Sequence, residues 1–114
     1  MTQEKRRYDR FDILHLSCVQ VYKDDSVFFE GMGRTLNVSK GGILLEIVCD
    51  QLLFGHIVLR IALEDDLVVL YGNIVHCNSK ELQLYHVGIE FLKMSEKTAR
   101  TLDKFIKVFE EQSS

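Results

Sequence analysis

The feature that most constrains the fold is an alternation of apolar and polar residues, which recurs between short polar clusters along most of the chain. It is clearest from residue 57 to residue 63, where apolar side chains occupy every second position: Ile57, Leu59, Ile61 and Leu63. Successive side chains of a β-strand point to opposite faces, so this period predicts a strand with one buried face. Comparable segments predict five further strands, at residues 13–22, 27–36, 43–48, 67–77 and 82–92.

Polar clusters between these segments indicate where the chain turns. Residues 24–26 (Asp-Asp-Ser), 64–66 (Glu-Asp-Asp) and 78–81 (Asn-Ser-Lys-Glu) predict tight turns, because these residue types favour turns. Residues 37–42 predict a polar loop that ends in glycine. The six strands are therefore expected to follow one another with short connections.

Two of the predicted strands contain signs of irregularity. Gly31 and Gly33 lie within the second strand, and glycine inside a strand often marks a bulge or a close approach to the backbone. In the sixth strand the apolar positions change parity near Tyr85 and His86, which predicts a bulge there.

The apolar period changes at the end of the chain. Ser95 is a good helix N-cap, and the apolar residues after it have helical spacing: Ala99, Leu102, Ile106 and Phe109. This pattern predicts a terminal helix over about residues 96–111. Six strands with short turns and one final helix predict an all-β fold with a C-terminal α-helix, in the form of a small six-stranded antiparallel β-barrel.

The composition indicates the broad class of protein. The 114 residues are 46% hydrophobic and 27% charged, which are ordinary values for one globular domain. No apolar run approaches the roughly 18 residues that span a bilayer, and no apolar stretch directly follows the basic N-terminus as it would in a signal peptide. Three cysteines without a C-x-x-C pair favour reduced, buried thiols. These features predict a cytoplasmic protein without a membrane segment.

Positive charge is concentrated near the N-terminus. The net charge is −3, which argues against a general nucleic-acid binder. Four of the six residues from position 5 to position 10 are nevertheless basic: Lys5, Arg6, Arg7 and Arg10. Such a run is typical of a solvated arm and also suits a local anion site. The predicted organisation is a flexible basic arm, residues 1–12, followed by a barrel domain, residues 13–114.

Two short motifs, in this order, resemble the signatures of the PilZ family. Arg6 and Arg10 fit R-x-x-x-R near the start of the domain. Asn37, Ser39 and Gly42 fit D/N-x-S-x-x-G after the second strand. Each motif is loose alone, and their order and separation strengthen the resemblance.

The resemblance extends over most of the chain. Residues 71–76 look like the penultimate strand of the family. Residues 87–91 and the Ser-capped helix after them look like the end of the family's domain. The family has a six-stranded antiparallel barrel of the split-barrel type with a C-terminal helix, which agrees with the fold expected from periodicity. It also implies a non-enzymatic receptor for the second messenger cyclic di-GMP, with no other cofactor.

The first motif suits this ligand chemically. Arginine presents a planar fork of donors that keeps its charge, and the fork matches either two phosphate oxygens or the O6/N7 edge of guanine. Arg6, Arg10 and the additional Arg7 are therefore the expected clamp on the ligand. The resemblance implies that the arm is loose without ligand and orders on binding.

The second motif would receive the ligand from the barrel. The Asn37 carbonyl could accept from guanine N–H groups, and Ser39 could donate to phosphate or ribose oxygens. Gly42, and with it Gly41, could adopt a positive φ and leave space for close approach. His76 stands where some relatives have tryptophan and would be a smaller stacking platform. Asn37 likewise replaces the more frequent aspartate, so both departures bear on affinity.

Other functions are less well supported by the sequence. No catalytic arrangement can be identified, and His76 and Cys77, being adjacent in a strand, do not make a metal site together. The resemblance implies a separate effector protein, for example in motility, pilus or exopolysaccharide machinery, and neither DNA, RNA nor membrane insertion is expected. Two alternatives stay open, namely a PilZ-like adaptor that does not bind nucleotide and a small-barrel module for single-stranded nucleic acid.

Overall fold

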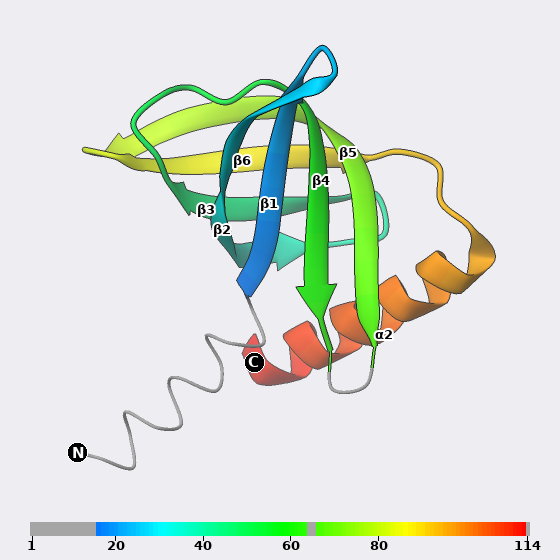
Figure 1. Cartoon of the computed structure of the whole chain (residues 1–114). Coiled ribbons are helices and arrows are strands. Elements are labelled where there is room, and N and C mark those ends of the chain that lie inside the picture. Colours follow the sequence, from blue (N-terminus) through cyan, green and yellow to red (C-terminus); the bar gives the residue numbers. More distant parts are fainter. Residues whose placement is uncertain (1–15, 64–65, 114) are drawn as a thin grey trace.

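The alternating segments of the sequence form strands in the computed structural model, which describes residues 16–63 and 66–113. The helix α2 follows the last strand (Figure 1). The six strands are β1 (Leu16–Lys23), β2 (Ser26–Val38), β3 (Gly42–Val48), β4 (Gly55–Ala62), β5 (Leu67–Glu81) and β6 (Leu84–Phe91).

All neighbouring strands pair antiparallel and close into a barrel in the order β1-β2-β3-β6-β5-β4. Pairing between β1 and β4 closes the barrel. The first half of β2 pairs with β1 alone, and the end of β5 beyond Ile74 pairs with β6 alone. The predicted fold class, a six-stranded antiparallel barrel with a C-terminal helix, is confirmed.

The core fills the inside of the barrel with the apolar residues of the period-two pattern. In β4 the side chains of Ile57, Leu59 and Ile61 are fully buried, as the alternation predicts. The other strands contribute inward residues in the same way, among them Val19, Val21, Leu45, Ile47, Val68, Leu70, Val87 and Ile89. Side chains between these positions are directed outward, so they are not part of the core and can contact other molecules from the barrel exterior.

The C-terminal helix α2 (Glu96–Ser113) covers one end of the barrel (Figure 1). The Ser95 hydroxyl accepts a hydrogen bond from the Thr98 N–H at 3.1 Å, which confirms the predicted N-cap. Leu102, Phe105 and Phe109 are buried in the same core cluster as the strands. Within the described residues no helix is both long and apolar enough to cross a membrane.

The β5–β6 connection differs from the sequence-based prediction. Residues 78–81, predicted as a turn, belong to β5, and all of them except Lys80 pair with β6. The turn itself is Leu82-Gln83. Gln83 adopts φ 63°, which the sequence did not signal because glycine or asparagine usually occupies such a position. Pairing with β6 holds the polar residues in the strand.

The irregularities also lie elsewhere than predicted. The β3–β6 register runs without a shift through Tyr85 and His86, so β6 itself has no bulge there. The irregularity beside Tyr85 is on β5, where Lys80 is unpaired between Ser79 and Glu81. Of the two leucines with the opposite parity, Leu82 belongs to the turn and Leu84 is half-buried at the start of β6. In β2 the register shifts do not fall at the two glycines, and instead each leaves one residue unpaired, Phe28 and Leu36.

The three cysteines are free, but they are not equally buried. Cys49 is buried and Cys77 is half-buried, whereas Cys18 is exposed. The expectation of buried thiols is therefore wrong for Cys18, whose position in β1 points outward between inward-facing neighbours. Burial raises the pKa of the Cys49 thiol and keeps it protonated at neutral pH.

Candidate functional site

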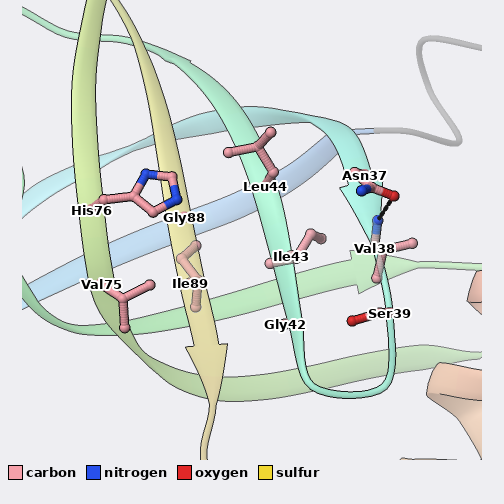
Figure 2. A pocket seen from close by; sticks show the side chains of 10 residues that line it. All are labelled: Asn37, Val38, Ser39, Gly42, Ile43, Leu44, Val75, His76, Gly88 and Ile89. Carbon is pink, nitrogen blue, oxygen red and sulfur yellow. Dashed lines mark hydrogen bonds between the residues drawn. The ribbon is translucent and has the colours of Figure 1, made fainter.

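A hollow of about 290 Å³ lies on the outer face of the barrel, across β2, β3, β6 and β5 (Figure 2). The turn between β2 and β3 closes one side of it. Its lining residues are Asn37, Val38, Ser39, Gly42, Ile43, Leu44, Val75, His76, Gly88 and Ile89.

The middle of this hollow is one cross-strand row. Asn37 pairs with Leu44, Leu44 pairs with Gly88, and Gly88 pairs with His76. Four adjacent strands at the usual spacing span about 14 Å. The row thus places a polar amide and an imidazole at the two ends of a floor made of leucine and glycine.

Two β-bulges shape the ends of this row. Leu36 is the unpaired residue between Thr35 and Asn37 in β2, and Val75 is unpaired immediately before His76 in β5. A bulge redirects the side chains beside it, which is why bulges recur next to functional sites. At the β5 bulge both Val75 and His76 are exposed, although consecutive strand residues ordinarily face opposite sides.

Hydrogen bonds fix the turn between β2 and β3. The Ser39 N–H donates to the Gly42 carbonyl at 2.9 Å, and the Gly41 N–H donates to the Ser39 hydroxyl oxygen at 3.3 Å. The Phe91 N–H of β6 donates to the Gly41 carbonyl at 2.9 Å. The turn is therefore held both internally and by a neighbouring strand, so its polar groups are already in place.

The glycines of this turn do not have the backbone conformation expected from the sequence. Neither Gly41 nor Gly42 has a positive φ, and among described glycines only Gly55 does, at 101°. Gly42 is needed for space instead, because a Cβ there would overlap the Ile89 carbonyl oxygen of β6. The close approach at Gly42 is therefore between two strands of the barrel, and the expected approach of a ligand stays a prediction.

A second polar row runs beside the hollow on the same outer face. The Glu46 carboxylate accepts from Arg34 at 3.0 Å and from His86 Nε2 at 3.2 Å, and the three residues pair across β2, β3 and β6. Burial opposes ionisation of Glu46, but the hydrogen bonds from Arg34 and His86 outweigh it and lower the pKa of this carboxyl. Glu46 is therefore ionised at neutral pH, and Arg34 neutralises its charge.

The predicted site residues have different outcomes. Asn37, Ser39, Gly42 and His76, which are far apart in the sequence, all line the hollow. Gly41 is not among the lining residues, and a Cβ at that position would meet open space. The three arginines of the first motif, Arg6, Arg7 and Arg10, lie outside the described residues.

Sequence reasoning missed the floor of the hollow. Leu44 and Gly88 enter the site only through strand register, which no local motif shows. A signal for Gly88 was nevertheless present, because glycine in the middle of an apolar strand often marks a close approach to the backbone.

β1 is the first strand after the arginine motif in the sequence, and it pairs with β2, which lines the hollow. Leu16, the first described residue of β1, pairs with Arg34 of β2, three residues before Asn37. β1 and β2 are antiparallel, so the N-terminal end of β1 and the Asn37 end of β2 lie at the same end of the barrel. Among the described residues, no group of three or more His, Cys, Asp or Glu side chains is arranged to hold a metal ion.

A closed barrel with a largely apolar hollow on its outer wall, which carries Asn37, Ser39 and His76 beside a fixed turn, defines a small β-barrel module with a candidate site on its exterior. The chain belongs to the PilZ domain family, whose model matches residues 4–107. This family typically binds cyclic di-GMP, and its members are generally non-catalytic receptor domains.

Two solved PilZ domains have similar structures. The crystal structure of the PilZ domain of CeSA from a cellulose-synthesizing bacterium has a TM-score of 0.63 at 15% identity, covering 83% of this chain and 91% of that one. The PilZ domain of YcgR from Escherichia coli, solved with c-di-GMP, has a TM-score of 0.67 at 14% identity, covering 86% of this chain and 83% of that one. At these identities the likeness establishes the fold. The search of curated proteins found no significant match.

Proposed function

We propose that this protein is a cyclic di-GMP receptor that signals by ordering its N-terminal arm against the barrel. The observation that carries the proposal is the hollow itself, which brings Asn37, Ser39 and Gly42 of one motif together with His76 from a distant strand. Family membership supports the ligand, since PilZ domains typically bind cyclic di-GMP.

The barrel side of the site has suitable groups for a guanine nucleotide. The Asn37 side-chain oxygen accepts from the Val38 N–H at 3.0 Å, which orients the amide and leaves its second lone pair for guanine N–H groups. The Ser39 oxygen accepts from the Gly41 N–H, so the hydroxyl hydrogen is available to a phosphate or ribose oxygen. His76 supplies a flat, exposed ring on which a base can stack.

Arg6, Arg7 and Arg10 complete the proposed site from the other side of the ligand. Five residues lie between Arg10 and Leu16. An extended segment of that length, counted as about six Cα-to-Cα steps, reaches about 20 Å. The start of β1 lies at the same end of the barrel as Asn37, so this reach is sufficient to bring the arginine forks over the hollow. There they would clamp phosphates or the O6/N7 edge of guanine.

The ordering of the N-terminal arm is also the event that transmits the signal. When the arm orders over the hollow, it presents a surface that the free protein lacks, and a separate effector of motility, pilus or exopolysaccharide machinery binds that surface. A cytoplasmic location belongs to the proposal, because free cysteines suit a reducing compartment. The second candidate is an adaptor that uses the same fold without nucleotide.

Isothermal titration calorimetry tests the proposal, with cyclic di-GMP, cyclic di-AMP and single-stranded RNA as three separate titrants. We expect cyclic di-GMP to bind far more tightly than cyclic di-AMP, because adenine N6 donates where guanine O6 accepts. Equal affinities would refute guanine recognition by the arginines. No binding of either dinucleotide would favour the adaptor, and binding of RNA alone would favour the nucleic-acid module.

A further inference from the structure

The imidazole of His76 rests directly on the backbone of Gly88. An ideal Cβ built at Gly88 would lie 2.5 Å from His76 Cε1 and 2.7 Å from Cδ2, and closer still to Nε2. Real Cβ atoms do not approach other atoms this closely, so the ring occupies the place where any other residue would have its side chain. Figure 2 shows the ring lying over β6 beside Gly88.

Two local features bring the ring to this place. His76 pairs with Gly88 across the β5–β6 ladder, and the unpaired Val75 immediately before it redirects the strand. His76 is exposed and lines the hollow, whereas Gly88 is buried beneath it. One face of the ring is therefore supported by backbone, and the ring remains accessible from the hollow.

We propose that Gly88 is a positioning residue of the site, which lets the His76 ring lie against β6 and form the platform for one purine base. This inference rests on the proposed function and adds a residue that neither motif contains. Gly88 acts through His76, since its own contribution is the absence of a side chain.

Alanine at position 88 is a suitable probe because the atoms it would displace belong to the end of a flexible side chain. The imidazole can rotate away while the strands stay paired. At Gly72, by contrast, a Cβ would meet the Glu90 carbonyl oxygen at 2.7 Å, so alanine there would strain the backbone. Gly31→Ala is the matched control, because its Cβ would press on the ring of Phe29 at 2.9 Å, in a strand segment that does not line the hollow.

The experiment is a double-mutant cycle on cyclic di-GMP affinity, measured by calorimetry for wild type, Gly88→Ala, His76→Ala and the double variant. We expect Gly88→Ala and His76→Ala each to weaken binding by about tenfold, near the lower end for loss of a base–aromatic stack. The double variant should bind no more than about twofold more weakly than His76→Ala, because the glycine has nothing left to position. Gly31→Ala should bind like wild type.

Each other outcome overturns a specific step. If Gly88→Ala weakens binding equally with and without His76, Gly88 does not act through the ring. If Gly88→Ala strengthens binding, the ring covers the floor and obstructs the ligand. If wild type does not bind cyclic di-GMP, the proposed function fails, and the platform fails with it. Ring contacts are checked separately by NMR, where His76 ring protons should show nuclear Overhauser effects to the Gly88 α-protons in wild type only.

Discussion

Gly41 and Gly42 are adjacent at the turn between β2 and β3, but replacing each with alanine should change the free energy of unfolding in opposite directions. A Cβ at Gly42 would overlap the Ile89 carbonyl oxygen, with the Ile89 carbonyl carbon at 3.5 Å and Glu90 Cα at 3.7 Å. All three atoms are backbone of the paired strand β6, so they cannot rotate away. A Cβ at Gly41 would meet nothing within 4 Å.

The size of each effect follows from these surroundings. Gly42→Ala has to push β3 and β6 apart, and overpacking of this kind costs about 2 kcal/mol. For a domain of this size that lowers the melting temperature by roughly 8 °C. Gly41→Ala enters open space at a backbone conformation that alanine can adopt, and it should stabilise by about 0.5 kcal/mol through the unfolded chain.

Urea unfolding followed by circular dichroism measures both variants against wild type. The slope of the transition should stay constant, so that a changed midpoint reports a changed free energy of unfolding. The reasoning is refuted if Gly42→Ala is as stable as wild type, or if Gly41→Ala loses as much as Gly42→Ala. Either result would mean that close strand approach is not what requires glycine at position 42.

Three further predictions concern charge and ligand contacts. Glu46→Gln should be less stable than wild type mainly above pH 4.5, because the pKa of Glu46 is lower in the folded protein than in the unfolded chain. Ionised Glu46 therefore stabilises the fold above the unfolded-state pKa, and this stabilisation is lost as the pH falls through the folded-state pKa. Urea unfolding at several pH values measures the difference, and a difference that does not change with pH contradicts the prediction. Asn37→Asp should bind cyclic di-GMP as tightly as wild type or more tightly in calorimetry, since a charged acceptor makes a stronger hydrogen bond, whereas a large loss would place Asn37 beside a phosphate. Arg10→Ala should change the free energy of unfolding by less than about 0.5 kcal/mol but weaken ligand binding by about 2 kcal/mol, and normal binding would remove this arginine from the site.

The strands and helix could be predicted because their apolar periods are local properties of the sequence. Ile57, Leu59 and Ile61 alternate and are buried in β4, and Ser95 caps α2 as its residue type suggests. The β5–β6 turn could not be placed in the same way. Leu82 and Gln83 are poor turn formers, and only the pairing of β5 with β6 determines where the chain reverses.

The candidate site shows the same division between local and long-range information. The spacing of Asn37, Ser39 and Gly42 marks the turn, and the resemblance to PilZ domains added His76. The row that joins Asn37 to His76 depends on register shifts at Leu36 and Val75, which follow from strand pairing and not from any local pattern. For that reason the sequence analysis did not assemble Leu44 and Gly88 into the floor of the hollow.

The central claim is that cyclic di-GMP is held between the N-terminal arm and the outer hollow of the barrel. Backbone amide hydrogen exchange, compared with and without saturating cyclic di-GMP, tests it most directly. We expect residues 5–11 to exchange rapidly in the free protein and slowly in the complex, and residues 37–42 to gain protection in the same complex. Binding that leaves both segments unchanged, or an arm that is equally protected without ligand, would contradict the account.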